Sequence, residues 1–463
     1  MFSVDTYQHR RERLKKQVGS GIILFLGNIE NPINFAHNTY PFRQDSTFLY
    51  YFGIKAPKLA AIIDLDENKE IIFGYELSID DIVWTGKQER LKEKAMKSGI
   101  NDSRPFDTLA SYLQQALQQN RFVHYLPAYQ SANKILISQL LQIKIDAIQP
   151  STTLIQAVVA QRSIKEEQEI VQIEEAIRVS TEMHLLAMRM TKPGIKEYEI
   201  TNAIQHLAAN QGCPFAYPPI VTIHGEILHN QANHNLLKSG DLVLNDSGVE
   251  TAMGYAGDLT RTFPVDRKFT TKQRELYDVV LKAFTDARDM LRPGITFKEV
   301  HLQAATSLVN GLKEVGLMQG NTEEAVKNHA HTMFFQCGLG HMMGLDVHDM
   351  EDLGEQYVGY TQAEPKDTTT FGLKSLRLGK ALEPGFVLTI EPGIYIIPDL
   401  IDMWRAEKKN EDFINYEKLE EYRHFGGIRI EDDFLITENN FRLLGPELIK
   451  TADEIENYRT NHV

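Results

Sequence analysis

The pattern of apolar and polar residues predicts an N-terminal domain in which strands and helices alternate. Short apolar runs at 21–27, 59–64 and 70–74 have the composition of buried strands, and the segments 5–17, 109–118 and 132–141 have helical character. This alternation is typical of an α/β domain. A loop-like stretch at 150–153 ends it, so we predict one domain over residues 1–153 and a second over 154–463.

The second domain opens on a different pattern, that of long amphipathic helices. Ser163 and Glu166 have the spacing of a capping box, and the helix that they start is expected to run to about Met190. Another helix is expected to begin near Lys196. The sequence Lys-Pro-Gly-Ile at 192–195 returns as Arg-Pro-Gly-Ile at 292–295. This echo indicates a duplicated unit of helices and hairpin.

The pattern with the clearest chemistry is a hairpin formed by 242–248 (LVLNDSG) and 257–262 (GDLTRT). Folding it about Ala252 would place Asp246 opposite Asp258, with Cβ atoms ~5 Å apart. Two like charges that face each other in a buried strand pair are destabilising unless something positive lies between them. A bound metal ion would meet that need. A solvent-facing ladder in a slipped register is the alternative, and the apolar character of both strands disfavours it.

Two further strand patterns each point a glutamate out of an apolar run. Glu391 lies in 388–395 (LTIEPGIY), and Glu431 in 428–433 (IRIEDD) shares a face with Arg429. Between the aspartate pair and the glutamate pair, a glycine-rich segment contains His341 and His348. Four carboxylates with one or two histidines have the stoichiometry of a dinuclear metal site, for which Mn(II) is favoured and Co(II), Fe(II) or Zn(II) are alternatives. Two such ions support hydrolysis, because they activate water and polarise a carbonyl.

Composition narrows the class of protein and its compartment. A net charge of −14 over 463 residues lacks the basic footprint of a general nucleic-acid binder. No secretory signal pattern opens the chain, and no apolar run approaches the ~20 residues of a membrane helix. The two cysteines, Cys213 and Cys337, give neither a disulfide framework nor a zinc-binding spacing. We therefore expect a cytoplasmic protein with no nucleic-acid or membrane partner.

Five motifs in order resemble those of aminopeptidase P and prolidase, which are metallopeptidases of the pita-bread fold (peptidase family M24). They are LVLNDSG with GYAGDLTRTF, GLGHMMGLDVHDM, LEPGFVLTIEPGIYI, FGGIRIEDDFLIT and, in the first domain, YPFRQDSTFLYYFG at 40–53. The resemblance implies an α/β N-terminal domain and an α+β catalytic domain, with duplicated helix and antiparallel-hairpin units around a curved sheet. It also implies hydrolysis of peptides that have proline in the second position.

Carried over residue by residue, the resemblance gives each motif position a role. The two metal ions would be held by Asp246, Asp258, His341, Glu391 and Glu431. Asp258 and Glu431 would bridge the ions, and Glu391 would double as the acid or base that shuttles a proton of the shared water. His229 would line the pocket for the proline ring, and His348 would hydrogen-bond the scissile carbonyl. Tyr395 and Arg429 would line the site, where Arg429 can orient carboxylates.

Two residues differ from the pattern usual in the family, and a third relates to contacts between subunits. Cys337 stands where the family usually has a histidine, and His37 stands where a bacterial aminopeptidase P would show an aspartate. Trp84 matches a tryptophan that reaches into a neighbouring subunit's site in this family. The resemblance implies a homodimer or a homotetramer.

Two specificities fit these motifs. The stretch 372–377 (GLKSLR) resembles the prolidase segment whose arginine, here Arg377, contacts the substrate carboxylate, and the insertion at 398–424 also resembles prolidase. The N-terminal signature favours an Xaa-Pro aminopeptidase, which we take as the first hypothesis, with an Xaa-Pro dipeptidase restricted to dipeptides as the second. A catalytically dead binding module and a creatinase-like amidinohydrolase are disfavoured, because such relatives lack the five ligands.

Overall fold

The computed structural model describes residues 1–231 and 234–462 and divides the chain into two compact units. The first unit comprises residues 1–162 and 350–357, and the second comprises 163–349 and 358–463. The division falls after Arg162, nine residues beyond the position expected from the sequence. Helix α7 (Thr152–Ser163) belongs to the first unit because its last turn is bonded there: Arg162 donates to the Thr47 hydroxyl, and the Gln161 carbonyl accepts from Tyr50.

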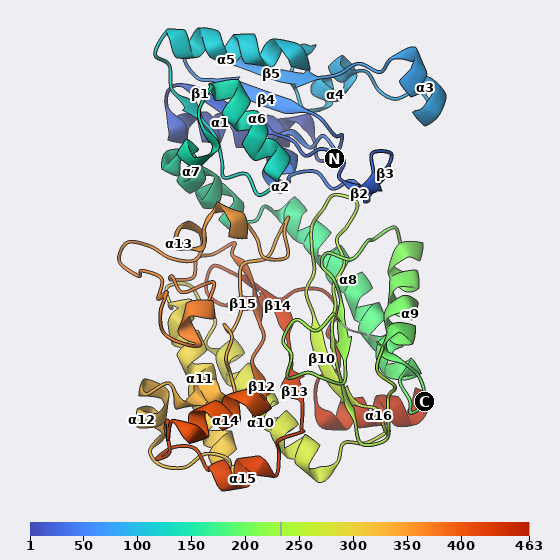
Figure 1. The fold of residues 1–463 in the computed structure, drawn as a ribbon, viewed down its shortest axis with the longest axis vertical. Helices are drawn as coiled ribbons and strands as arrows, with labels where there is room; N and C mark the ends of the chain where they lie inside the picture. Colours follow the sequence, from blue (N-terminus) through green and yellow to red (C-terminus); the bar gives the residue numbers. More distant parts are fainter. Residues whose placement is uncertain (232–233, 463) are drawn as a thin grey trace. The chain divides into compact units, whose positions relative to one another are not determined.

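The first unit is built on a five-stranded mixed sheet (Figure 1). Its strands lie in the order β6 (Asp102–Pro105), β5 (Lys69–Gly74), β4 (Ala60–Asp64), β1 (Ile22–Leu26) and β7 (Val123–His124). The three central strands pair antiparallel, while β6 and β7 pair parallel to their neighbours. The apolar runs expected to form strands are therefore the centre of this sheet.

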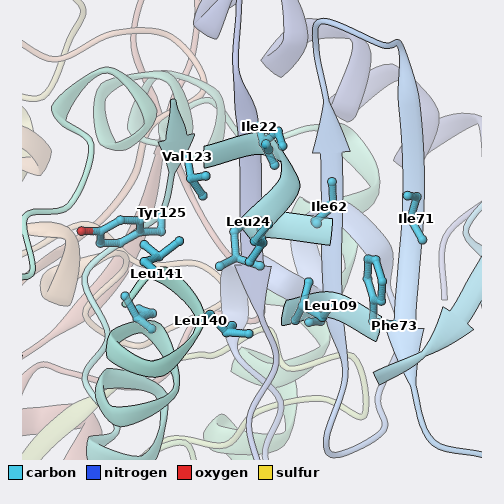
Figure 2. Close-up of a cluster of buried hydrophobic side chains, with 14 residues drawn as sticks. Ile22, Leu24, Ile62, Ile71, Phe73, Leu109, Val123, Tyr125, Leu140 and Leu141 are labelled. Carbon is cyan, nitrogen blue, oxygen red and sulfur yellow. The ribbon is translucent and has the colours of Figure 1, made fainter. Parts of the chain in front are cut away.

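Both faces of the sheet are covered, which explains why its strands are continuously apolar rather than alternating. Figure 2 shows the cluster on one face, where Ile22, Leu24 and Ile62 meet side chains of α5 (Leu109–Gln118) and α6 (Ser131–Leu141). On the other face, Phe25 packs against aromatic rings of α2 (Ser46–Phe52). The remaining elements of this unit are α1 (Val4–Val18), α3 (Ile79–Thr85), α4 (Leu91–Lys97) and the small hairpin of β2 (Pro32–Phe35) and β3 (Asn38–Thr39).

The second unit contains two pairs of packed helices, each linked through a Pro-Gly turn. The first pair is α8 (Glu167–Met190) with α9 (Glu197–Asn210), and the second is α10 (Thr271–Asp289) with α11 (Phe297–Glu314). The expected cap of α8 was wrong: Ser163 ends α7, and the capping box of α8 is formed by Glu166 and Glu169. The other helices are α12 (Thr322–Lys327), α13 (Glu355–Val358, assigned mostly to the first unit), α14 (Pro398–Ala406), α15 (Tyr416–Glu420) and α16 (Ala452–His462).

The strands of the second unit form small antiparallel sheets. Their orders are β10 (Thr260–Pro264), β9 (Leu242–Asp246), β8 (Ile220–Thr222); β11 (Val387–Ile390), β14 (Asp432–Ile436), β15 (Phe441–Leu443); and β12 (Gly393–Tyr395), β13 (Gly427–Arg429). Isolated bridges join Thr260 to Glu431 and Met342 to Leu388. The strand pattern expected over 428–433 is therefore interrupted, and Glu431 lies between β13 and β14.

The register predicted for the β9–β10 hairpin was wrong by two residues. Asp246 lies opposite Thr260, and the turn is centred on Met253 because Glu250 bridges Ala256. A shift of two residues keeps every side chain on its original face, whereas a shift of one would have reversed them. Asp246 and Asp258 thus still share a face, although they are not direct opposites. Close approach of the two arms requires glycine at 248, where a Cβ would lie 1.9 Å from the Gly257 carbonyl oxygen.

Across the described residues, no helix has both the length and the apolar character needed to span a membrane.

Candidate metal centre

Five segments of the second unit bring together the residues that the sequence suggested as metal ligands. They are Asp246 at the end of β9, Asp258 just before β10, His341 in the glycine-rich segment 338–344, Glu391 just after β11, and Glu431 between β13 and β14. We call these five residues the candidate metal cluster. Ligand atoms of Asp258, His341 and Glu431 all lie within 4.8 Å of one another, and all three residues are buried.

Asp246 and Asp258 meet through a residue that the sequence did not single out. The hydroxyl of the half-buried Tyr217 lies 2.8 Å from Oδ1 of Asp246 and also contacts Oδ1 of Asp258. The two carboxylates therefore converge on one point, even though the hairpin register offsets them.

The imidazole of His341 is aimed at the carboxylates. Its Nε2 lies 3.4 Å from Oδ2 of Asp258 and 3.6 Å from Oε1 of Glu391, while Nδ1 lies 3.0 Å from the Met342 carbonyl. A carbonyl at Nδ1 favours the tautomer in which Nε2 carries the lone pair, as expected of a metal-binding histidine. Its backbone is fixed against β11, since its amide donates to the Thr389 hydroxyl.

Glu391 leaves β11 at the point where the glycine-rich loop crosses that strand. Its amide donates to the Leu339 carbonyl at 2.7 Å, and the Thr389 hydroxyl lies 3.4 Å from Oε1. Gly340 makes this crossing possible, because a Cβ there would lie 2.1 Å from the Thr389 carbonyl oxygen. The glycine content of the motif thus has a steric cause.

Glu431 is held by the neighbouring hairpin. Oε2 accepts a 2.6 Å hydrogen bond from the Thr260 hydroxyl, and its amide donates to the Thr260 carbonyl. On the same hairpin, the amide of Asp258 donates at 3.0 Å to Oδ2 of Asp433. Donors of the hairpin therefore hold two carboxylates of the 431–433 segment, and the second of these bonds also fixes the backbone of Asp258.

Arg429 and Tyr395 line the site, as the sequence suggested. Arg429 places Nη2 2.5 Å from Oδ2 of Asp246, Nη1 2.9 Å from the Tyr395 hydroxyl and Nε 3.2 Å from the Thr260 hydroxyl. The Cys337 thiol lies 3.9 Å from the Tyr395 hydroxyl, and burial raises its pKa to about 12. The side chain of Cys337 is therefore a neutral thiol at physiological pH. It lacks the imidazole of the histidine that usually stands at this position in the family.

The remaining predicted residues of the second unit lie beside the candidate metal cluster. The ring of His348 is edge-on to that of His341, with centroids 4.2 Å apart. His229 is exposed at the site, and its pKa is lowered by burial of part of the ring and by the positive charges of Arg429 and Arg377. Burial raises the pKa of Glu391, and the positive charge of Arg377 opposes that rise, so this charge acts on the same site.

Two of the predicted residues, Trp84 and His37, lie in the first unit, and the structure describes them within that unit only. Trp84 is on α3 and is 86% exposed, and the whole of that short helix lacks buried residues. His37 is exposed in the turn between β2 and β3. Nothing in the first unit holds either side chain in a core.

The electrostatics of the candidate metal cluster fit a divalent cation. Burial, together with the neighbouring carboxylates, raises the pKa of Glu431 well above its usual range and that of Glu391 to about 8, and burial also raises the pKa of Asp258. Carboxylates packed this closely cannot all ionise without a compensating positive charge. Carboxylate oxygens and one imidazole are also the donor set that suits Mn(II) and its neighbours.

Apart from Arg429, sequence reasoning missed the residues that hold the ligands. For Thr260 a signal existed, because it lies two residues after Asp258 and so shares its face of the hairpin. Asp433 was visible only as part of an acidic run. Tyr217 carried no signal, since it lies in the proline-rich segment 214–219, far from every motif.

Two family models match the chain. The model described as metallopeptidase family M24 matches residues 171–438, and the model described as the aminopeptidase P N-terminal domain matches residues 7–124. Together they cover both units, and the M24 model contains the whole candidate metal cluster.

Individual relatives divide between two activities. The chain is 32% identical to an Xaa-Pro aminopeptidase of Escherichia coli (strain K12), over 97% of this chain and 96% of that protein. It is 31% identical to an Xaa-Pro dipeptidase of Rattus norvegicus, over 96% of this chain and 90% of that protein. Among solved structures, aminopeptidase P from E. coli with the inhibitor Pro-Leu matches with a TM-score of 0.82 and 30% identity, over 100% of this chain and 99% of that one.

Proposed function

The chain belongs to metallopeptidase family M24 and has the pita-bread fold of aminopeptidase P, and from this premise we propose that it is an Xaa-Pro aminopeptidase. It would hydrolyse the bond between an N-terminal residue and a following proline. The observation that carries the proposal is the convergence of the candidate metal cluster, with three of its ligand-bearing side chains within 4.8 Å of one another. A binding module that had lost its activity would have no need to retain all five.

The proposed cofactors are two divalent ions, with Mn(II) favoured and Co(II), Fe(II) or Zn(II) as alternatives. Asp246, Asp258, His341, Glu391 and Glu431 would hold them, with Asp258 and Glu431 shared between the two. When bound, such ions lower the pKa of water and polarise a carbonyl. The single histidine among four carboxylates favours hard ions over zinc.

The chain's own groups supply orientation and proton transfer. Glu391, which is half-buried and lies at the edge of the cluster, would accept and return a proton during hydrolysis. His348, whose ring packs on that of His341, would donate a hydrogen bond to the oxygen of the scissile carbonyl. Arg429 fixes the orientation of Asp246 through their 2.5 Å ion pair. His229 would form the wall against which the proline ring lies.

Proline explains why this design suits its substrate. An Xaa-Pro bond is a tertiary amide without an N–H, so a peptidase cannot use the usual hydrogen bond from that group. Recognition must then rest on the free amine, the carbonyl and the rigid ring. The candidate metal cluster and the nearby imidazoles offer groups for each of these.

Xaa-Pro dipeptidase activity is the second candidate, and one observation favours it. The positive charge of Arg377 acts on both His229 and Glu391, so a cation lies near two groups proposed to act on the substrate, and it would be available to a dipeptide carboxylate. A dipeptidase needs such a group, whereas an aminopeptidase must leave space for the chain beyond proline. The sequence identities, 32% to an aminopeptidase and 31% to a dipeptidase, do not favour one activity over the other.

A paired assay tests the proposal. The Mn(II)-loaded chain is offered Ala-Pro and a longer peptide that begins Arg-Pro, and we expect release of the first residue from both. Cleavage of the dipeptide alone would replace the first candidate with the second. Absence of cleavage together with absence of tightly held metal would refute both. Asp258→Asn should lower turnover by more than roughly 100-fold while the chain stays folded, because it removes a ligand proposed to bridge the ions.

The state of assembly and the compartment stay predictions. The exposed Trp84 on α3 supports a homodimer or homotetramer in which this helix meets another subunit. The expected cytoplasmic location rests on the sequence pattern.

A further inference from the structure

Arg261 is fully buried on the face of β10 opposite to the candidate metal cluster, and all five of its N–H groups are bonded. Asp258 and Thr260 point toward the cluster, so Arg261 points away from it. The acceptors are the carbonyls of Ile449 (2.8 Å from Nε), Thr260 (2.9 Å from Nη1), Glu431 (2.7 Å from Nη1) and Leu448 (3.0 Å from Nη2), and Oδ1 of Asp432 (2.6 Å from Nη2).

The contact of Arg261 with Glu431 supplies a hydrogen-bond donor to a backbone carbonyl at a break in the strand pairing. Between β13 and β14 the chain leaves its regular ladder, and a single isolated bridge joins Glu431 to Thr260 on the neighbouring hairpin. A buried carbonyl at such a break needs a donor from elsewhere. Nη1 of Arg261 supplies it, and the same nitrogen holds the carbonyl of Thr260. The guanidinium of Arg261 therefore binds the backbone of both segments where Thr260 pairs with Glu431.

The pairing of Thr260 with Glu431 joins two of the segments that carry the candidate metal cluster. Asp246 and Asp258 come from the β9–β10 hairpin, whereas Glu431 comes from the segment between β13 and β14. The guanidinium of Arg261 is ion-paired within the same region, because Oδ1 of the buried Asp432 lies 2.6 Å from Nη2, while Oδ2 of Asp432 pairs with Lys450 at 2.9 Å. Arg261 is thus an ion-paired group, held by five hydrogen bonds, at the point where a shift of the hairpin or of the 430–433 segment would change the distance between ligands.

We propose that Arg261 is a positioning residue that sets the separation of the hairpin ligands from Glu431 and so sets metal affinity. The inference rests on the metal site of the proposed function. Lysine keeps the positive charge but offers three donors on a compact head, without the planar fork that reaches five acceptors. Arg261→Lys should therefore weaken metal binding while it leaves the charge of the region unchanged.

The experiment titrates Mn(II) into the metal-free full-length chain and follows the free ion by electron paramagnetic resonance. We expect Arg261→Lys to bind Mn(II) roughly 10-fold or more weakly than the wild type, the scale on which groups behind metal ligands act. At saturating Mn(II), kcat should fall and KM should change little, because substrate contacts are intact.

Arg459 provides the matched control. It is also a fully buried arginine whose guanidinium bonds backbone carbonyls, those of Asp266, Met188, Thr191 and Val265, and it contacts no member of the candidate metal cluster. Arg459→Lys should lower the unfolding temperature of the metal-free chain about as much as Arg261→Lys does. It should bind Mn(II) like the wild type.

The outcomes separate the two proposals. Wild-type Mn(II) affinity in Arg261→Lys, with a loss of stability equal to that of Arg459→Lys, would show that Arg261 is merely structural. A wild-type chain that binds no Mn(II) would overturn the metal site and this inference together. If Arg261→Lys does not fold, Asp432→Asn takes its place, because it removes the carboxylate that holds the guanidinium. Unchanged Mn(II) affinity in that variant would overturn the inference.

Discussion

The phenol oxygen of Tyr217 lies 2.8 Å from Oδ1 of Asp246, and it contacts Asp258 as well. A phenol has one proton and can donate it to only one of the two carboxylates. The second contact therefore needs a protonated carboxyl group or a cation close by. This arrangement gives a physical reason, independent of any motif, for a positive charge at this point.

Tyr217→Phe should weaken the site without unfolding the chain. Loss of the hydroxyl frees both aspartates to rotate, and we expect Mn(II) affinity and kcat to fall about 10- to 100-fold, as for other groups that orient metal ligands. The unfolding temperature of the metal-free chain should stay within a few degrees of the wild type. Tyr255→Phe is the control, because its hydroxyl bonds Glu169 away from the candidate metal cluster. Equal effects of both substitutions on metal affinity would contradict the role given to Tyr217.

Glu197 should control the loop that presents His229. This fully buried carboxylate accepts from the amide of Ile223 at 2.8 Å and from the amide and side chain of Asn235 at 3.1 and 3.0 Å. It thus holds the chain on both sides of His229. Glu197→Gln replaces an acceptor with an NH₂ group that faces donors, so the loop should loosen and KM for an Xaa-Pro peptide should rise several-fold, on the order of 1 kcal/mol in binding.

The kinetic signature of the Glu197 substitution can be checked by a double-mutant cycle. If Glu197 acts through His229, then His229→Ala should cost less in the Glu197→Gln background than in the wild type. Glu199→Gln, on the same helical turn, is the control, because Glu199 is exposed and bonds the Lys196 amide instead. Additive effects of the two substitutions would show that the loop is not coupled to Glu197.

Two buried histidines should make the chain acid-sensitive. His301 and His331 are each 1% exposed, their ring centroids lie 6.4 Å apart, and neither ring nitrogen of either one has a hydrogen-bond partner among the described residues. Burial lowers the pKa of His301 to about 4 and that of His331 to about 3. The nearby charged or titratable groups that add to these shifts are Lys298 for His301, and the neighbouring rings of His301 and His329 for His331.

The sign of the pH effect follows from these directions. In the unfolded chain both rings protonate below about pH 6.5, while in the folded chain they stay neutral, so the unfolded state binds more protons. The free energy of unfolding should therefore fall as pH drops from 6.5 toward 4, by about 1.4 kcal/mol per pH unit for each ring. Above pH 7 the two rings contribute no pH dependence.

His301→Leu should flatten that dependence. The substitution removes an imidazole with unpartnered nitrogens from an apolar setting, so stability at pH 5 should rise relative to the wild type, and less so at pH 7.5. Urea unfolding of the metal-free chain at both pH values measures the difference. The exposed His206, changed to leucine, is the control and should leave the pH dependence unchanged. A parallel loss of stability in wild type and His301→Leu would refute the assignment.

Arg377→Met should separate the two specificities. If the Arg377 guanidinium receives the carboxylate of a dipeptide, KM for Ala-Pro should rise about 10-fold or more, since a charge-assisted hydrogen bond contributes about 1.5–3 kcal/mol. Cleavage of a longer Arg-Pro peptide should change little, because no carboxylate follows its proline. Lys374→Met, in the same loop but exposed, is the control. Equal losses on both substrates would place Arg377 in a role common to both.

The sequence by itself determined the identities of the site residues and the faces on which they lie. A period of two along 242–248 and 257–262 puts Asp246 and Asp258 on one face in any register that differs by an even number of residues. The same period placed Arg429 and Glu431 together. Apolar runs at 21–27, 59–64 and 70–74 likewise identified the central strands of the first unit, because burial on both sides leaves little freedom in composition.

Only the tertiary structure decided how these residues meet. The hairpin register depends on the bridge from Glu250 to Ala256, and the break at Glu431 depends on its pairing with Thr260. Tyr217 and Arg261 contribute through contacts with residues 29 and 170 or more positions away, in addition to any local bonds. Such contacts leave no periodic trace in the sequence, because one polar side chain can satisfy a distant partner from many chain positions. The ligands and Arg429 could therefore be identified from local pattern, whereas Tyr217 and Arg261, which hold other parts of the site, could not.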